Sequence, residues 1–104
     1  MSLQDITLTN FFEETSTGLV LVDFWAPWSE PCKMLTSALE ELASEMKGAV
    51  KVLAVNVEEN KELAAIFGVV SVPNILIIKN GEMEESLIGY APKEELMEII
   101  GEHL

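Results

Sequence analysis

Cys32 is the only cysteine of the sequence, and Ser29 stands three residues before it. Ser29 suits the N-cap of a helix that begins near Glu30, so the Cys32 thiol should lie one turn inside that helix. A thiol at that depth is partly buried, and the Glu30 carboxylate adds a negative charge that disfavours the thiolate form. We therefore expect Cys32 to be a slowly reacting thiol.

Asp23 interrupts the most apolar run in the first half of the chain, which extends from Leu19 to Trp25. A nearly unbroken apolar run is typical of a strand that is covered on both faces. Ionising a carboxyl group there carries a desolvation cost, so the pKa of Asp23 should rise. The alternative is a structural carboxylate near the strand end that bonds to water or to backbone groups.

The composition restricts the class of protein. The 104 residues include six Lys, no Arg and 18 acidic side chains, which give a formal net charge of −12. Such an acidic balance argues against binding to nucleic acid or to an anionic membrane surface. With 49% hydrophobic residues and a mean hydropathy of +0.28, the chain can bury a core and is not expected to be disordered. The length fits a single domain over residues 1–104.

Several kinds of site are not expected. One cysteine cannot form an intrachain disulfide, which excludes a disulfide-stapled secreted scaffold. One Cys and the single His103 supply too few ligands for a metal cluster, and no Gly-rich phosphate loop is visible, so we expect neither a metal nor a cofactor. No apolar stretch approaches the roughly 20 residues that cross a bilayer, and no secretory signal is visible. We expect a cytoplasmic protein that does not enter a membrane.

Apolar periodicity and turn signals predict an alternation of strands and helices. The expected strands are Ile6–Leu8, Leu19–Trp25, Val50–Val57, Asn74–Lys79 and Met83–Gly89, with Asn80-Gly81 as the hairpin turn between the last two. The expected helices run from a cap at Thr9 or Asn10 to before Gly18, from about Glu30 to Lys47, from a cap at Asn60 to Gly68, and from Pro92 through Leu96, Ile99, Ile100 and Leu104. The order βαβαβαββα predicts an α/β fold with a mixed five-stranded sheet, helices on both faces and an antiparallel hairpin at one edge.

The segment from Val22 to Lys33 resembles the thioredoxin family. The family signature is Trp-Cys-Gly-Pro-Cys-Lys, with Asp-Phe-Trp-Ala shortly before it. This chain has Asp-Phe-Trp-Ala at residues 23–26 and Trp-Ser-Glu-Pro-Cys-Lys at residues 28–33. Val72-Pro73 resembles the family's cis-proline step, Lys79-Asn80-Gly81 its hairpin, and Gly89 the glycine beside its binding surface. The resemblance covers essentially the whole chain and implies the thioredoxin fold.

The resemblance also implies an activity, the reduction of protein disulfides, with thioredoxin reductase as the partner of an intact site. Ser29 stands at the position of the attacking cysteine, Cys32 at that of the resolving cysteine, and Asp23 at that of the buried proton acceptor. A serine hydroxyl is not ionised near neutral pH without a base beside it, and it cannot form a disulfide. Thioredoxins commonly place a lysine near the aspartate on the third strand. We match that position to Val55, which would leave Asp23 still more easily protonated.

The resemblance further implies a cis bond at Val72-Pro73 and a peptide-binding surface. The expected apolar patch around Ser29 comprises Trp28, Pro31, Val70, Val72 and Gly89, with Pro73 at its edge. Trp25 suits a packed core position better than Trp28 does. We expect Met34 and Met46 to lie in the core, and we expect the paired glutamates to be solvated.

Three functional hypotheses remain open, whether Ser29 is native or introduced. The chain is a thioredoxin disabled in dithiol cycling, a redox-silent module that binds unfolded segments or a protein partner, or a monothiol sensor that works through Cys32. In each case we expect protein clients and a monomer.

Overall fold

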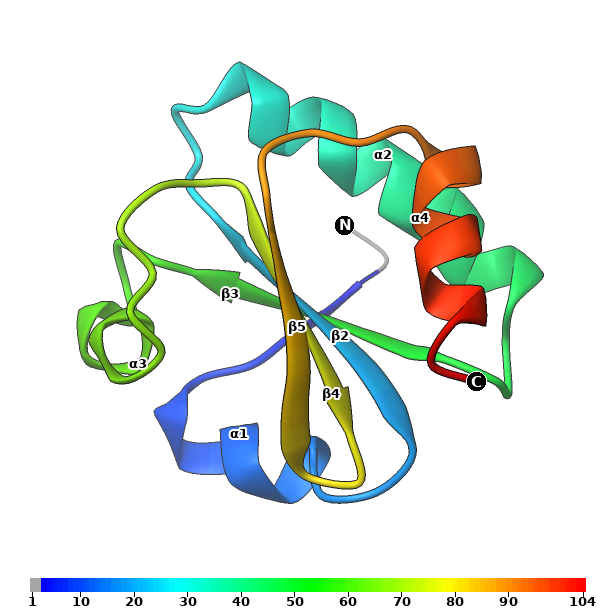
Figure 1. Ribbon diagram of the computed structural model, residues 1–104. Coiled ribbons are helices and arrows are strands. Elements are labelled where there is room, and N and C mark those ends of the chain that lie inside the picture. The colour runs from blue at the N-terminus through cyan, green and yellow to red at the C-terminus, as the bar shows by residue number, and fades with distance from the viewer. Residues whose placement is uncertain (1–2) are drawn as a thin grey trace.

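The computed structural model describes residues 3–104 of the chain. Within them the strands are β1 (Gln4–Asp5), β2 (Leu19–Trp25), β3 (Lys51–Asn56), β4 (Asn74–Lys79) and β5 (Glu82–Ile88). The helices are α1 (Leu8–Glu14), α2 (Glu30–Glu45), α3 (Lys61–Ile66) and α4 (Lys93–Gly101). The elements follow the predicted order βαβαβαββα, and Figure 1 shows the sheet crossing the middle of the molecule.

The sheet is mixed, as predicted, and β2 lies at its centre. The strand order is β1-β3-β2-β4-β5. β2 is parallel to β3 and antiparallel to β4, and β4 and β5 form the expected antiparallel hairpin at one edge. The hairpin turn is Asn80-Gly81, and both residues have positive φ angles, 50° and 85°. That backbone explains the Asn-Gly pair, because these two residue types accept positive φ at least cost.

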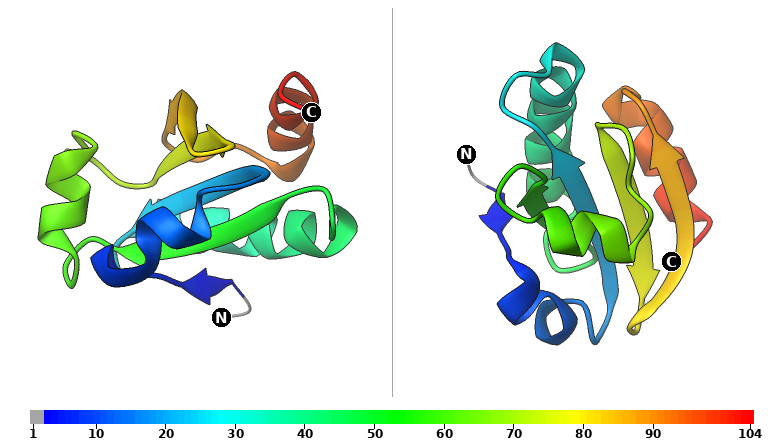
Figure 2. Two further views of the ribbon diagram at one scale, coloured as in Figure 1. Left: turned by 90° about the horizontal axis from the view of Figure 1, so that it is seen from below. Right: turned by 90° about the vertical axis from the view of Figure 1, so that its left-hand side faces the viewer.

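Helices cover both faces of the sheet, which confirms the predicted architecture. On one face Leu35, Leu39 and Leu42 of α2 pack with Leu96 and Ile100 of α4. On the other face Phe11 of α1 and Leu63 of α3 pack against alternate residues of the central strands. Figure 2 shows α1 and α3 on the opposite side of the sheet from α2 and α4. No helix within residues 3–104 is long and apolar enough to cross a membrane.

The prediction for the first elements was wrong by several residues. β1 ends at Asp5, before the expected strand at residues 6–8, although the buried Ile6 still donates its N–H to the Ala54 carbonyl at 2.9 Å. The first helix begins at Leu8 with Thr7 as N-cap, so the expected cap at Thr9 or Asn10 is also wrong. Asn10 acts instead from inside the helix, because its Oδ1 accepts the Thr7 N–H at 2.9 Å.

Two apolar residues do not take the places that the sequence predicted, Met34 in the core and Leu104 on the apolar face of the last helix. Met34 is 54% exposed because it lies beside the Leu35, Leu39 and Leu42 stripe of α2 rather than on it. Leu104 is 65% exposed because α4 ends at Gly101, before the helical periodicity can reach it. Met46 does pack against the core from a partly buried position.

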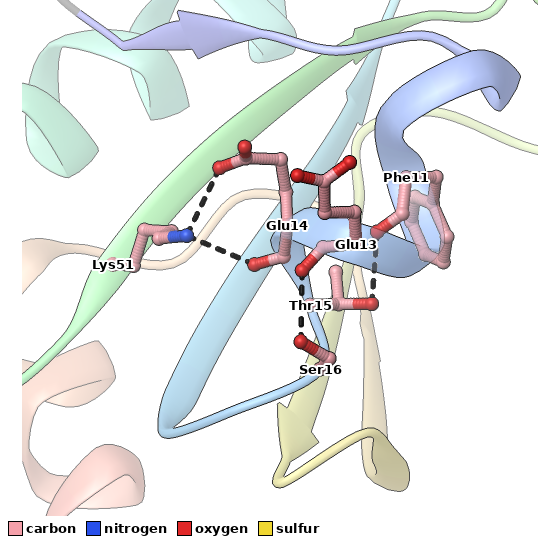
Figure 3. A network of polar contacts seen from close by, with 6 residues as sticks. All are labelled: Phe11, Glu13, Glu14, Thr15, Ser16 and Lys51. Atoms are coloured by element: carbon pink, nitrogen blue, oxygen red, sulfur yellow. Dashed lines mark hydrogen bonds and ion pairs between the residues drawn. The ribbon is translucent and has the colours of Figure 1, made fainter.

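Lys51 satisfies the C-terminal end of α1, a helix with no basic residue in its own last turn. Its Nζ donates to the backbone carbonyl and to the carboxylate of Glu14, each at 3.0 Å. Figure 3 shows Lys51 reaching these groups from β3, while Thr15 and Ser16 hydroxyls donate to the carbonyls of Phe11 and Glu13. A cation at this position is favourable because the last carbonyls of a helix lack intrahelical partners and carry partial negative charge. The contact also ties α1 to the sheet.

A β-bulge brings two consecutive glutamates of β5 to one histidine. Ile77 pairs with Glu85 but Ile78 pairs with Met83, so Glu84 is an extra residue in the ladder. His103 Nε2 lies 2.9 Å from a Glu85 oxygen and Nδ1 lies 3.3 Å from a Glu84 oxygen. These hydrogen bonds, first to Glu85 and then to Glu84, raise the pKa of His103 above its ordinary value of 6.5.

We expect His103→Gln to lower the thermal midpoint at about pH 6 and to leave it nearly unchanged at about pH 9. The pKa of His103 is raised in the folded state, so its stabilisation is full below 6.5 and is lost as the pH rises through the raised value. Thermal melts of both proteins across this range test the prediction. Glu84→Gln/Glu85→Gln is the matched control and should abolish the same pH dependence. A loss of stability that is equal at both pH values would contradict it.

Candidate functional site

Ser29 caps α2, as its position in the sequence predicted. Its backbone is extended (φ −95°, ψ 117°), and its Oγ accepts the Cys32 N–H at 3.3 Å. The Ser29 N–H donates to the Ala26 carbonyl at 3.2 Å, so the turn before the helix is closed as well. Pro31 lies in the first helical turn, where the N–H that proline lacks would have no partner. Ser29 is only 5% exposed.

Cys32 is buried more completely than expected, with 1% of its surface exposed. Its carbonyl accepts the Thr36 hydroxyl at 2.9 Å. The residue lines a hollow of about 350 Å³ whose other walls are Trp25, Ala26, Pro27, Lys33 and Thr36. Burial in mainly apolar surroundings makes a thiol less reactive.

Glu30 is not the only charged side chain close to Cys32 in the sequence, because Lys33 follows Cys32 directly. Its carboxylate contacts Lys33 Nζ at 3.2 Å, and both side chains are largely exposed. An exposed pair of this kind contributes little to stability. The lysine nevertheless offsets part of the negative charge that the sequence places beside Cys32.

Asp23 lies in β2 and is fully buried, as the sequence predicted. Within residues 3–104 no side-chain or backbone group donates to Oδ1 or Oδ2, so the alternative of a carboxylate bonded to backbone is wrong. Burial raises the pKa of Asp23 from its ordinary value of 3.8 to about 7. Asp23 lies on the same face of β2 as Leu21 and Trp25, which pack under α2 and α4, because side chains two residues apart in a strand share a face. Its carboxyl group therefore points toward the layer that contains Cys32.

The third-strand position beside Asp23 is Ala54, so the assignment to Val55 was wrong by one residue. The register pairs Asp23 with Ala54 across β2 and β3. Ala54 belongs to the core under α2 and α4, whereas Val55 belongs to the core under α1 and α3. A shift of one residue in a strand moves the side chain to the other face of the sheet. The consequence is unchanged, because Ala54 supplies no cation either.

The cis-proline step and Gly89 meet at the same end of the sheet. The Val72-Pro73 bond is cis, as expected, and the Pro73 carbonyl accepts the Gly89 N–H at 2.9 Å. Asn74, which follows Pro73, pairs with Phe24 near the end of β2, where the turn toward Ser29 begins. Figure 1 shows the segments before α2, before β4 and after β5 at this one end of the sheet.

The exposed apolar residues of this end include those expected for the patch. Trp28 is 68% exposed and Val70 is 93% exposed, whereas Trp25 packs against the core. Pro31 is exposed and Val72 is partly exposed. Ile88 and Tyr90, which flank Gly89, are also exposed, and the sequence patterns had not identified them.

Glu58 is a further residue of the site that sequence reasoning missed. Its Oε2 accepts the Trp28 indole N–H at 2.6 Å, so it holds the orientation of an otherwise exposed ring. The Glu58 backbone N–H donates in turn to Asn56 Oδ1 at 2.9 Å. The parallel pairing of β2 and β3 could have pointed to Glu58. The carboxyl ends of the two strands lie side by side, so the segments that follow them, with Trp28 and Glu58, lie close together.

The site lacks the parts of a serine nucleophile. The Ser29 oxygen already accepts a backbone hydrogen bond, and the only histidine, His103, contacts Glu84 and Glu85 on β5. A serine hydroxyl needs an adjacent base to attack a substrate. The arrangement is therefore suited to capping and to binding at the surface, with one buried thiol behind the cap.

Comparisons with known proteins agree with one another. The family model described as Thioredoxin matches residues 2–102. The chain is 46% identical over 104 residues to a protein named Thioredoxin from Bacillus subtilis (strain 168), covering the whole of both chains. It is 48% identical over 102 residues to Thioredoxin from Listeria monocytogenes, covering 98% of this chain and 99% of the relative. Thioredoxin from Staphylococcus aureus is 38% identical over the whole of both chains.

We expect Asp23→Asn to raise the free energy of unfolding by about 2 to 4 kcal/mol at about pH 8 and to change it little at about pH 4. In the folded protein Asp23 has a pKa of about 7 and keeps its proton until the pH approaches that value. In the unfolded chain its pKa is the ordinary 3.8, so the proton is lost at a much lower pH. The destabilisation by Asp23 therefore grows as the pH rises from about 4 to 7 and is constant above that. Urea unfolding at several pH values measures it. Asp5→Asn, at an exposed strand position, is the matched control, and a gain that does not vary with pH would contradict the prediction.

We expect Cys32 in the folded protein to react with iodoacetamide at least about tenfold more slowly than in the unfolded chain at the same pH, because the thiol is 1% exposed. The measurement is the rate of alkylation near neutral pH, followed by mass spectrometry. The same protein in guanidinium chloride supplies the reference rate. Equal rates in the two states would show that burial does not limit the thiol.

Proposed function

The chain belongs to the thioredoxin family, and from that premise we propose that it keeps the family's fold and protein-binding face but is inactive in dithiol–disulfide exchange. The observation that carries the proposal is the placement of Ser29. It occupies the N-cap of α2, where its oxygen accepts the Cys32 N–H, and Cys32 is the only sulfhydryl of the chain.

The family reaction needs two sulfur atoms in the protein. The first thiolate attacks one sulfur of a substrate disulfide, forms a mixed disulfide and releases the other substrate sulfur as a thiolate. The second thiolate then attacks the mixed disulfide, which frees the reduced substrate and leaves a disulfide in the protein. Two electrons have passed to the substrate, and a reductase returns them to the protein.

This chain cannot complete the two-step reaction. The Ser29 oxygen is not ionised without a base, and it cannot form a disulfide with Cys32. Cys32 could exchange once with a disulfide, but no second sulfur exists to resolve the mixed disulfide. No intramolecular disulfide can then form, so thioredoxin reductase has no substrate on this protein. The family's buried proton acceptor, whose position Asp23 matches, would then have no reaction cycle in which to act.

The second candidate is a redox-silent module that binds unfolded segments or a protein partner. The observation that favours it is the exposure of Trp28, at 68%, and of Val70, at 93%, beside the cis-proline step. Large exposed apolar side chains that gather on a small protein mark an interaction surface. We propose a monomeric protein in the cytoplasm whose clients are protein segments.

The third candidate, a monothiol sensor at Cys32, has less support. The thiol is 1% exposed, and its hollow is walled mainly by Trp25, Ala26 and Pro27. A redox sensor instead needs an accessible thiol with thiolate character. The alkylation rate described above tests this candidate directly.

We expect the chain as given to show no catalytic reduction of insulin disulfides, and we expect Ser29→Cys to show turnover. The substitution restores the two-cysteine motif at the helix terminus, where unpaired N–H groups favour a thiolate. Insulin precipitation with dithiothreitol as reductant measures the activity.

The matched control is the exchanged pair Ser29→Cys/Cys32→Ser. It has the attacking thiol but no resolving thiol, so when insulin is added without dithiothreitol the reaction should stop at a mixed disulfide between this variant and insulin. Appreciable turnover by the unmodified chain would refute the proposed inactivity. If folded Ser29→Cys fails to turn over, the scaffold has lost more than the first sulfur and the binding candidate gains support.

A further inference from the structure

Five exposed apolar residues form what we term the docking face: Trp28, Met34, Val70, Ile88 and Tyr90. Their exposed fractions range from 44% to 93%. Met34 and Tyr90 line one hollow of about 240 Å³ between α2 and the start of α4, and Tyr90 and Ile88 line a second of about 300 Å³ beside Gly89. The docking face therefore extends from the cis-proline step across to α2.

Carboxylates border the docking face on several sides. Glu58 holds the Trp28 ring, and Glu30 begins α2 with a side chain that is 78% exposed. Glu41 and Glu94 line the hollow that contains Met34 and Tyr90, and Glu95 lines the hollow that contains Ile88. These five carboxylates come from α2, α4 and the segment after β3, so they form a border rather than one cluster.

The lysines that contact this border are already paired. Lys33 contacts Glu30 at 3.2 Å. Lys93 lies 3.6 Å from Glu41 and also contacts Glu45, and the charge of Glu94 acts on it as well. Three carboxylates thus surround one ammonium group beside Met34 and Tyr90, which leaves an excess of negative charge at that hollow.

We infer that the docking face selects protein segments in which apolar residues are flanked by Lys or Arg. The inference rests on the proposed function and specifies its client. An apolar client side chain covers the exposed ring and aliphatic groups, while a long cationic side chain lays its stem along Met34 and Tyr90 with its charge near Glu41 and Glu94. The net charge of −12 also attracts such a client at a distance and repels an acidic one.

The test uses three fluorescein-labelled peptides that share a Val-Leu-Val centre and differ in their flanks, Lys-Lys, Gln-Gln or Glu-Glu. We expect fluorescence anisotropy at low salt to give the Lys peptide at least about tenfold higher affinity than the Glu peptide. The difference should shrink strongly at about 0.5 M salt, because screening shortens the reach of exposed charges.

Glu41→Gln/Glu94→Gln should remove at least about half of the low-salt preference for the Lys peptide over the Glu peptide. Glu82→Gln/Glu102→Gln removes the same charge at exposed positions, at the start of β5 and directly after α4, and should retain the preference. Circular dichroism melts confirm that both variants are folded.

The outcomes separate the client preference from the proposed function. Equal affinity for the three peptides overturns the preference and leaves the binding role intact. An equal loss in both double variants overturns the location at the docking face. Failure of all three peptides to bind overturns the docking face itself. Turnover by Ser29→Cys depends on none of these results and tests the proposed function separately.

Discussion

The central constraint on this protein is that β2 is buried on both faces. β3 and β4 take up its backbone hydrogen bonds, and helices cover its two sides, so β2 offers no solvated face for a polar side chain. Asp23 breaks that rule, and its raised pKa is the physical consequence. Asp23 lies in the core under α2 and α4, where ionising its carboxyl group is costly. The free energy of unfolding of the whole fold therefore depends on pH.

The same strand positions the site. The turn that follows β2 leads into α2, and Ser29 ends that turn by capping the helix. Because β4 is antiparallel to β2, Asn74 begins β4 where β2 ends, which brings Pro73 and its partner Gly89 to the same place. The Ser29 cap and the cis-proline edge of the docking face therefore both lie where β2 ends. The sheet places them there whether or not the site retains its chemistry.

Replacing a cysteine by serine at a helix N-cap costs the fold little, because serine is among the best capping residues. The effect on chemistry is large, since oxygen neither forms the mixed disulfide nor ionises without a base. Under the proposed function, fold and activity therefore separate at Ser29. The scaffold, the cis-proline step and the exposed Trp28 are present, and the proposed function makes binding at that surface independent of redox chemistry.

The sequence alone determined the order of elements, the hairpin at Asn80-Gly81, the cap at Ser29 and the burial of Asp23. These features depend on local periodicity, on turn chemistry and on the apolar residues around one carboxyl group. Only the tertiary structure decided that Ala54, not Val55, lies beside Asp23, because register is set by pairing between distant strands. Only it showed that Glu58 holds Trp28 and that Met34 is exposed beside Tyr90, since those contacts join segments that fold together from distant parts of the chain.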